Sequence, residues 1–365
     1  MNGTIFDVAK LRPSIIGTGL IALDVVINED VRASPRLWAG GTCGNVLTIL
    51  SYLNWQSFPI ARFGEDKAAQ LVRHDLQKWG VCLDWSSLEP KGETPIFLHY
   101  IQKNAFGNPV HRFVRVCPQC GTTYPGYKPV HATVAADIAT HLMVPQVFFL
   151  DRLSRGALTL AQSCANQGAI IVFEPSGIKE ENLFNEAMAL AHIVKYSQER
   201  LVNIDAFNRS SGPLLEIRTM GGAGLAYRSR IEKCSTNGWQ HIDAYPAMML
   251  RDSAGAGDWC TAGIIHTVGR GGIAEFCLMT PEKLYEALCF GQALAAWNCG
   301  FEGARGGMYE VSKEVLQLEI KSILDRHLEP RLASIERLLE TTDGEPDSDV
   351  LQEICLTCRC SRDEM

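Results

Sequence analysis

The stretch DSAGAGDWCTAGIIHTV, residues 252–268, places small residues and an aspartate directly before a long apolar run. This run predicts a buried helix over residues 258–269. Small residues at a helix start expose unpaired N–H groups that point the same way, which makes a site for an anion. Such a site can hold the charge of a phosphoryl group in transfer, and Asp258 could accept a proton from an attacking hydroxyl. Taken alone, Asp258 could equally be a partner of the helix dipole.

The chain around this stretch alternates between strand-like and helix-like patterns. Apolar strand patterns occupy residues 144–150, 169–175, 192–197 and 214–220. Helical patterns lie near residues 155–167, 180–191 and 281–299. The alternation predicts an α/β fold with a doubly wound, mostly parallel sheet and helices on both faces.

The N-terminal third begins with the same rhythm and then departs from it. Residues 14–27 form an apolar β-rich segment, and residues 45–54 predict a helix with Asn45 as N-cap. A second helical pattern over residues 66–79 ends at a glycine, which is a natural helix terminator. Two strand-like runs around an Asn/Gly turn then predict a β-hairpin over residues 94–116.

Composition limits the classes of function. The chain has 365 residues, 46% of them hydrophobic and 21% charged, with a formal net charge of −7. This charge argues against generic binding to nucleic acid or to an anionic membrane, so we expect a small-molecule partner. No apolar stretch is long enough to span a membrane, and the N-terminus lacks the pattern of a signal peptide, so we expect a cytoplasmic protein.

Three further stretches contain glycines that can bring the backbone close to a ligand. GTGLIA at 17–22 fits a dinucleotide fingerprint poorly, because β-branched residues continue the strand and Asp24 comes too early. AGGTCGN at 39–45 and RTMGGAG at 218–224 each read, taken alone, as a tight turn. The chain has no P-loop.

The order of these stretches carries more information than any one of them. GG-x-x-x-N at 40–45 is followed by FGED at 63–66, T-x-G-x-x-G at 219–224 and DSAGAGD at 252–258. This order resembles the ribokinase family of sugar and nucleoside kinases, also called the PfkB family, over about residues 14–310. The resemblance implies a ribokinase-like fold with a small β-sheet lid, and an ATP-dependent phosphotransferase that acts with Mg²⁺ on a hydroxyl of a sugar or related small polyol.

The resemblance also assigns parts of the chain. The kinase domain is expected over residues 1–345, with a lid from about 18–38 and 92–135 that ends in a CPxCG turn. Because the family's lid often forms a dimer interface, a homodimer is expected through it. Residues 346–365 are expected to be a linker and a cysteine-rich C-terminal tail.

Four sets of residues take roles from the resemblance. The catalytic base and the anion hole for the γ-phosphate are expected to be Asp258 with Gly255, Ala256 and Gly257. The sugar is expected to be held by Asp24, Gly40, Gly41 and Asn45. ATP is expected at Ser197, Thr219, Gly221 and Gly224. A monovalent cation is expected at the carbonyls of Asp252 and Ala254.

One element departs from the family. The family usually carries Asn-x-x-Glu before the ATP-binding strand, where it helps to organise Mg²⁺ and phosphate. Here KYSQER places Ser197 and Arg200 at those positions, with Glu199 one place away. Some fructokinase-like members also have serine at the first position. The departure therefore leaves an alternative open: a catalytically weak family member with a regulatory or scaffolding role through a zinc-linked tail.

Two Cys-x-x-Cys pairs stand apart from the remaining cysteines. CPQCG at 117–121 follows the expected lid hairpin, and CLTC at 355–358 lies in the tail. Together they can supply the set that structural Zn²⁺ prefers, namely Cys117, Cys120, Cys355 and Cys358, with Cys360 as an alternate. The other reading is a group of redox-active or incidental thiols.

Substrate identity does not follow from the sequence. The hairpin carries polar side chains that could contact an acceptor or form a solvated face: His99, Tyr100, Gln102, His111 and Arg112.

Overall fold

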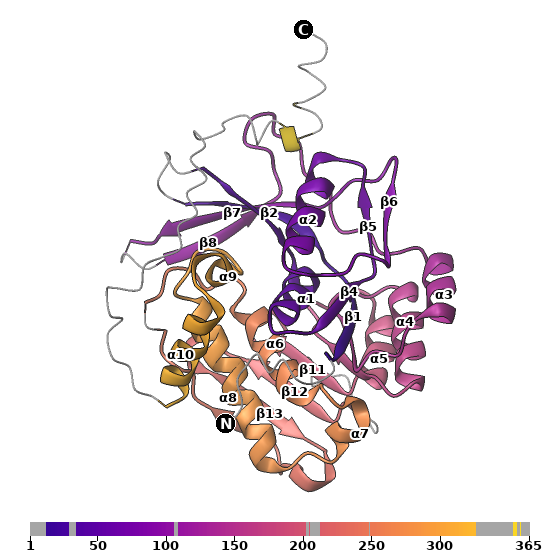
Figure 1. Cartoon of the computed structure of the whole chain (residues 1–365), viewed down its shortest axis with the longest axis vertical. Helices are drawn as coiled ribbons and strands as arrows, with labels where there is room; N and C mark the ends of the chain where they lie inside the picture. Colours follow the sequence, from indigo (N-terminus) through magenta and orange to yellow (C-terminus); the bar gives the residue numbers. More distant parts are fainter. Residues whose placement is uncertain are drawn as a thin grey trace.

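The computed structural model describes residues 12–28, 34–105, 109–201, 204, 212–247, 249–325, 353–355 and 358. Its centre is an eight-stranded sheet with the strand order β14-β13-β12-β11-β10-β9-β1-β4 (Figure 1). The strands are β1 (Ser14–Thr18), β4 (Gln56–Pro59), β9 (Val147–Leu150), β10 (Ile170–Phe173), β11 (Ile193–Ser197), β12 (Leu215–Thr219), β13 (Leu225–Ser229) and β14 (Gln240–Ile242). The neighbouring strands from β4 to β12 pair in parallel, whereas β13 pairs antiparallel with both β12 and β14.

Both faces of this sheet are buried, as the predicted doubly wound fold requires. Consecutive side chains of a strand point to opposite faces. In β9, Val147 and Phe149 belong to one hydrophobic core, whereas Phe148 and Leu150 belong to the other. The first core contains side chains of α1 (Thr42–Tyr52), α6 (Ala256–Val268), α8 (Pro281–Asn298) and α10 (Lys313–Leu324), and the second those of α3 (Ala132–His141), α4 (Arg155–Asn166) and α5 (Glu181–Leu190).

A separate four-stranded sheet is the lid. Its strand order is β3-β2-β7-β8, with β3 (Arg36–Gly40), β2 (Ala22–Ile27), β7 (Ile96–Lys103) and β8 (Pro109–Val114). The expected hairpin is confirmed, because β7 and β8 pair antiparallel. Helix α2 (Lys67–Lys78) packs against β3 and β2. Smaller elements are β5 (Ala61–Gly64), β6 (Ser86–Glu89), α7 (Gly272–Cys277), α9 (Gly306–Glu310), η2 (Gly221–Ala223) and η3 (Glu232–Cys234).

The chain crosses from the large sheet to the lid inside the apolar segment 14–27. Strand β1 ends at Thr18 and β2 begins at Ala22, so the segment forms one strand in each sheet. A Cβ at Gly19 would lie 1.7 Å from Oδ1 of Asp151, so only glycine fits at this crossing. The first glycine of GTGLIA therefore lies in a strand that is followed by another strand, not by a helix, and the rejection of a dinucleotide fingerprint is confirmed.

The prediction of Asn45 as a helix N-cap is wrong. Helix α1 begins at Thr42, and its N-cap is Gly41, which has a φ of 79°. A glycine adopts this left-handed conformation without the steric penalty of a side chain, and it lets the helix start three residues earlier than predicted. Asn45 lies inside the helix and is almost fully buried, so its side chain is free for another role.

The predicted domain boundary at residue 345 and the linker before the tail lie outside the described residues. Within the described ranges, no helix is both long enough and apolar enough to cross a membrane.

Candidate functional site

Helix α6 begins where the small residues of DSAGAGD place it. Its N-cap, Gly255, has a φ of 74°, and a Cβ there would lie 2.2 Å from the carbonyl oxygen of Ala304. Ala256 and Gly257 form the first turn with Asp258, which is the acidic residue of that turn. The first N–H groups of a helix have no partner within it, so this entrance favours an anion.

Asn45 connects the GG-x-x-x-N segment to Asp258. Its side-chain amide donates a hydrogen bond of 2.7 Å to Oδ2 of Asp258, and its carbonyl oxygen accepts one of 3.1 Å from Nε of Arg305. The two segments come together because α1 packs on α6. Asn45 thus fixes the orientation of the Asp258 carboxylate from the opposite helix.

The pKa of Asp258 is raised to about 7. Burial is the largest cause, and the nearby carboxylate of Glu174 adds to it, whereas the Asn45 hydrogen bond and Lys195 act in the opposite direction. A general base works best when its pKa lies near the working pH. Asp258 is therefore suited to accept a proton near neutrality.

Asp24 lies on the lid strand β2 beside the two glycines. A Cβ at Gly40 would lie 1.9 Å from Oδ2 of Asp24, so the carboxylate occupies the space that a side chain would need. Burial raises the pKa of Asp24 to about 7, against the opposing effects of Arg305 and of the Gly41 N–H. The residues expected to hold the sugar are thus connected. The Asp24 carboxylate lies against Gly40 and interacts with the Gly41 N–H, and Arg305 interacts with both Asp24 and Asn45.

Arg305 is a central residue that sequence reasoning missed. It is 1% exposed and donates hydrogen bonds to Asn45, to the carbonyl of Ala39 and to Oδ2 of Asp75, the last at 2.8 Å. Tyr309 donates to the same Asp75 carboxylate. The Nη1 atom of Arg305 is buried without a hydrogen bond among the described residues, so one donor remains available. The sequence GARGG around Arg305 matches no motif that predicts its hydrogen bonds to Asn45 and Asp75.

A buried ion pair lies beside the entrance to α6. Nζ of Lys195 is 2.8 Å from Oε1 of Glu174, and the hydroxyl of Thr261 donates to Oε2 at 2.5 Å. A Cβ at Gly257 would lie 3.7 Å from Nζ of Lys195. Burial is the largest single influence on the pKa of Lys195 and opposes its charge, but Glu174, Cys260 and Asp258 together outweigh it and raise the pKa, which favours the charged ammonium. Lys195 lies in β11 and is the first residue of the KYSQER element.

The residues expected to bind ATP lie together at the carboxyl ends of β11 and β12. Ser197 and Thr219 are partners in the parallel register of these strands. The turn that follows Thr219 contains Gly221 with a φ of 57° and Gly224 with a φ of 92°. A Cβ at Gly221 would meet nothing within 4 Å, so this turn leaves open space beside it.

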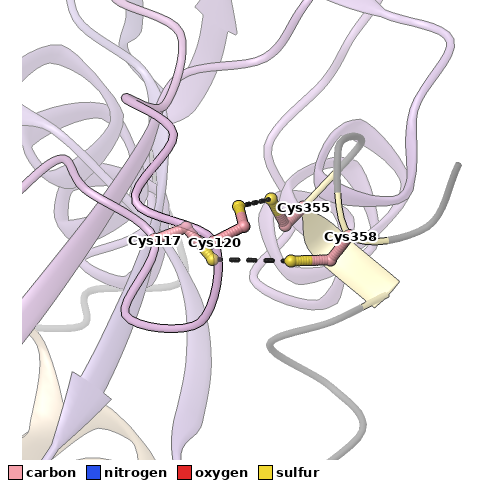
Figure 2. A group of neighbouring side chains, drawn as sticks. All are labelled: Cys117, Cys120, Cys355 and Cys358. Atoms are coloured by element: carbon pink, nitrogen blue, oxygen red, sulfur yellow. Dashed lines mark hydrogen bonds between the residues drawn. The ribbon is translucent and has the colours of Figure 1, made fainter. Parts of the chain in front are cut away.

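The four predicted cysteines converge, although their two segments are far apart in the chain. Figure 2 shows Cys117 and Cys120 on the loop after β8 and Cys355 and Cys358 on the tail, with their sulfur atoms turned toward one another. Each pair of facing sulfurs crosses between the segments: Cys117 to Cys358 at 3.8 Å and Cys120 to Cys355 at 3.6 Å. All four lie within 4.8 Å of one another.

These separations suit a metal ion and not a disulfide. A disulfide requires sulfurs about 2.05 Å apart. Four thiolates at about 2.3 Å from Zn²⁺ in a tetrahedron lie about 3.8 Å from one another. Hydrogen bonds with Thr122 lower the pKa of Cys120 to about 6, whereas burial raises the pKa of Cys355 and of Cys358. Cys360, the alternate ligand, lies outside the described residues.

The fold and the residues gathered at the α6 entrance define a class of proteins, the ATP-dependent carbohydrate kinases. The model of the pfkB family carbohydrate kinases matches residues 19–310. The chain belongs to this family.

Solved structures of several kinases share the fold. A fructokinase from Xylella fastidiosa with bound ATP has a TM-score of 0.62 and 17% identity, over 87% of this chain and 100% of that one. An aminoimidazole riboside kinase from Salmonella enterica, complexed with aminoimidazole riboside and an ATP analogue, has a TM-score of 0.61 and 20% identity, over 84% and 99%. A ribokinase from Arabidopsis thaliana, complexed with ribose and ATP, has a TM-score of 0.58 and 16% identity, over 86% and 99%. No curated protein sequence matches the chain.

Proposed function

We propose that this kinase transfers the γ-phosphoryl group of ATP to a hydroxyl of a sugar or related small polyol. One observation carries the proposal: the Asp258 carboxyl, with a pKa of about 7, lies in the first turn of α6 and is oriented by Asn45. The base and the helix N-terminus are then side by side, as in-line transfer to a hydroxyl requires.

In this mechanism, Asp258 accepts the proton of the attacking hydroxyl. The N–H groups at Gly255, Ala256 and Gly257 stabilise the charge that develops on the phosphoryl group. Lys195, beside Gly257, adds a positive charge to that environment. Because these groups are held in place before reaction, little reorganisation is needed during transfer.

ATP and Mg²⁺ fit the donor groups that are present. The open turn at Gly221 and the neighbouring Ser197 and Thr219 leave room for the nucleotide. The carboxylate of Glu174 is a hard oxygen donor of the type that Mg²⁺ prefers. When bound, Mg²⁺ neutralises charge on the β- and γ-phosphates. The monovalent cation at Asp252 and Ala254 stays a prediction, and the Ala254 carbonyl already accepts a hydrogen bond from Asn298.

The acceptor site is suited to hydroxyl groups. Asp24 and Asn45 offer polar side chains, and Gly40 and Gly41 allow the backbone to come close. A panel of sugars, nucleosides and polyols should be incubated with isotopically labelled ATP and the full chain. We expect a labelled phosphomonoester with at least one hydroxyl acceptor, and transfer to none of them would contradict the proposal.

A second candidate is the catalytically weak scaffold. The replacement of Asn-x-x-Glu by Ser197 and Arg200 favours it. The buried Lys195–Glu174 pair favours the active kinase instead, because it places the Lys195 ammonium beside Gly257, where the proposed anion hole lies. If no acceptor in the panel receives phosphate although ATP binds normally, the result would support the scaffold.

We also propose that Cys117, Cys120, Cys355 and Cys358 hold a structural Zn²⁺ that fastens the tail to the end of the lid. Ile354 and Cys355 are buried in the main hydrophobic core, so this part of the tail is packed against the domain (Figure 1). Four protein ligands leave no open position for catalysis. The metal would therefore act on stability and on lid position.

A homodimer through the lid is a further part of the proposal. Strand β8 is the edge of the lid sheet, and it exposes Val110 and Phe113 by 44% and 46%. An exposed apolar edge strand is a ready partner for a second copy. Light scattering should give a dimer for the wild type and a monomer for Val110→Glu; equal masses would contradict this interface. The cytoplasmic location stays a prediction.

A further inference from the structure

A second group of metal-ligating side chains lies between the lid and the loop that leads into α6. His99 is on β7, His111 is on β8, and Asp252 precedes α6. Nε2 of His99 lies 3.3 Å from Oδ2 of Asp252, and Nδ1 of His111 lies 3.3 Å from Oδ1. One ligand atom from each residue lies within 4.8 Å of the others. None of these side chains has a role in the proposed phosphoryl transfer.

His99 is the residue that needs an explanation. A solvated face was one of two readings of the polar residues of this hairpin, but the side chain of His99 is fully buried. In the part of the chain that the structure describes, neither ring nitrogen has a hydrogen bond. Burial is the largest influence on the pKa of His99 and lowers it, against the opposing effect of Asp252. A buried polar group without a hydrogen bond commonly marks an ion or water that completes the site.

Asp252 supplies the negative charge. Its carboxylate is 2% exposed and accepts hydrogen bonds of 2.9 Å from the backbone N–H groups of Ala254 and Gly303. These bonds fix the carboxylate with its oxygens toward the two imidazoles. A buried carboxylate that faces two imidazole rings favours a cation between them.

The spacing suits a small transition-metal ion. Zinc binds histidine nitrogen and carboxylate oxygen at about 2.0–2.2 Å, so neighbouring ligand atoms in a tetrahedron lie about 3.3–3.4 Å apart. Each imidazole has a nitrogen at about this distance from one of the two carboxylate oxygens, His99 from Oδ2 and His111 from Oδ1, both at 3.3 Å. Imidazole nitrogen also separates this site from the expected monovalent cation, because ligands to hard cations are oxygens.

We propose that His99, His111 and Asp252 form a binding site for a divalent transition metal of the zinc class. The metal joins two lid strands to the start of the DSAGAGD stretch. On the lid sheet, Asp24 pairs with Phe97, two residues before His99, so Asp24 and His99 share one face. Metal binding therefore holds the face that carries Asp24 over the acceptor site. This inference does not depend on the identity of the acceptor.

Zinc titration of the full chain tests the proposal. Protein stripped with a chelator is titrated with Zn²⁺ alone by calorimetry, and the metal content is measured after gel filtration. We expect two Zn²⁺ per chain. Cys355→Ser should lose one of them, and His111→Gln should lose the other or weaken it at least about 10-fold, because even an indirect ligand partner contributes that much. His241→Gln is the control, since His241 forms an exposed pair with Asp243 at 3.0 Å and belongs to no group of three metal-ligating side chains among the described residues.

Unchanged zinc binding in the histidine variants would overturn the proposal. If His99→Gln and His111→Gln both keep the zinc content and affinity of the wild type, the three residues are an ion pair only. Zinc retained at the cysteine cluster shows that each variant is folded. If the cysteine cluster binds no zinc, the wild type should hold one ion and the His111→Gln variant none, and an unchanged thermal transition then reports folding.

Discussion

The entrance to α6 and the two clusters of metal-ligating side chains are built in opposite ways. At the entrance, the anion site and Asp258 come from consecutive residues, and their geometry follows from the local start of one helix. In the cysteine cluster, the facing residues are 241 and 235 positions apart in the chain. In the histidine cluster, two lid strands meet a loop beside the large sheet. The comparison shows that a site formed by one turn of the chain can be predicted from a sequence motif, whereas a site formed between elements depends on how those elements pack.

Lys195 tests whether the α6 entrance works through its consecutive residues alone. It lies beside this entrance but comes from β11, far from residues 255–258 in the chain. Lys195→Met should lower kcat by about 100- to 1000-fold, since it removes a preorganised positive charge and leaves Glu174 unpaired. Steady-state kinetics with saturating ATP measures this. Lys128→Met, which removes only an exposed pair with Glu93, is the control. A kcat within two-fold of the wild type for Lys195→Met would show that the α6 entrance acts alone.

Gly40 tests whether lid and catalytic loop act together. Gly40→Ala places a Cβ where Oδ2 of Asp24 lies, so Asp24 must move. We expect kcat/KM for the acceptor to fall by about 100-fold, as for a misplaced substrate, while KM for ATP stays unchanged. Gly177→Ala is the matched control, because a Cβ there meets nothing within 4 Å. An equal loss for ATP would mean that the change disturbs the whole site.

The pH dependence separates the two raised carboxyl groups. Asp258 and Asp24 both have pKa values raised to about 7, so each is protonated below that pH. Because a protonated Asp258 cannot accept the hydroxyl proton, kcat/KM should fall about 10-fold per pH unit below about 7 and level off above it. The Asp24→Asn variant should keep this fall. A flat profile from pH 5 to 8 would contradict the role of Asp258.

The cysteine cluster should have the smallest effect on chemistry. Cys120→Ser should release the Zn²⁺, lower the thermal midpoint by several degrees and make the tail sensitive to protease, because metal binding contributes to folding. We expect kcat to change by less than about five-fold, since the metal contacts no reacting group. Cys82→Ser, outside the cluster, is the control. Full zinc content in Cys120→Ser would rule out the four-thiolate site.

Much of the fold was legible because its signals are local. Buried parallel strands such as β9 and β10 appear as short apolar runs, and α2 ends at Lys78, two residues before Gly80, whose φ is 78°. The start of α1 was misjudged because Asn45 matches the usual N-cap type, while the true cap is Gly41 with its positive φ. In that case a tertiary role, contact with Asp258, explains the asparagine better than helix capping does.

The candidate site was legible only in part. Asp258 and the glycines carry motifs, and the cysteine pairs carry a metal-binding pattern. Arg305, Asp75 and Glu174 carry none, because their roles arise from packing between α2, α6 and the loop before α9. The sequence left open whether His99 contacts an acceptor or is solvated, and its burial rules out the second reading; alternation along a strand does not tell which face other elements cover.

Asp258→Asn is the most direct test of the account. The change keeps the shape of the side chain and removes its ability to take a proton. Single-turnover transfer from labelled ATP to the best acceptor should slow by about 100- to 10,000-fold, while the Kd for ATP stays within about three-fold of the wild type. A variant that transfers phosphate at a rate close to that of the wild type would contradict the claim that Asp258 is the base.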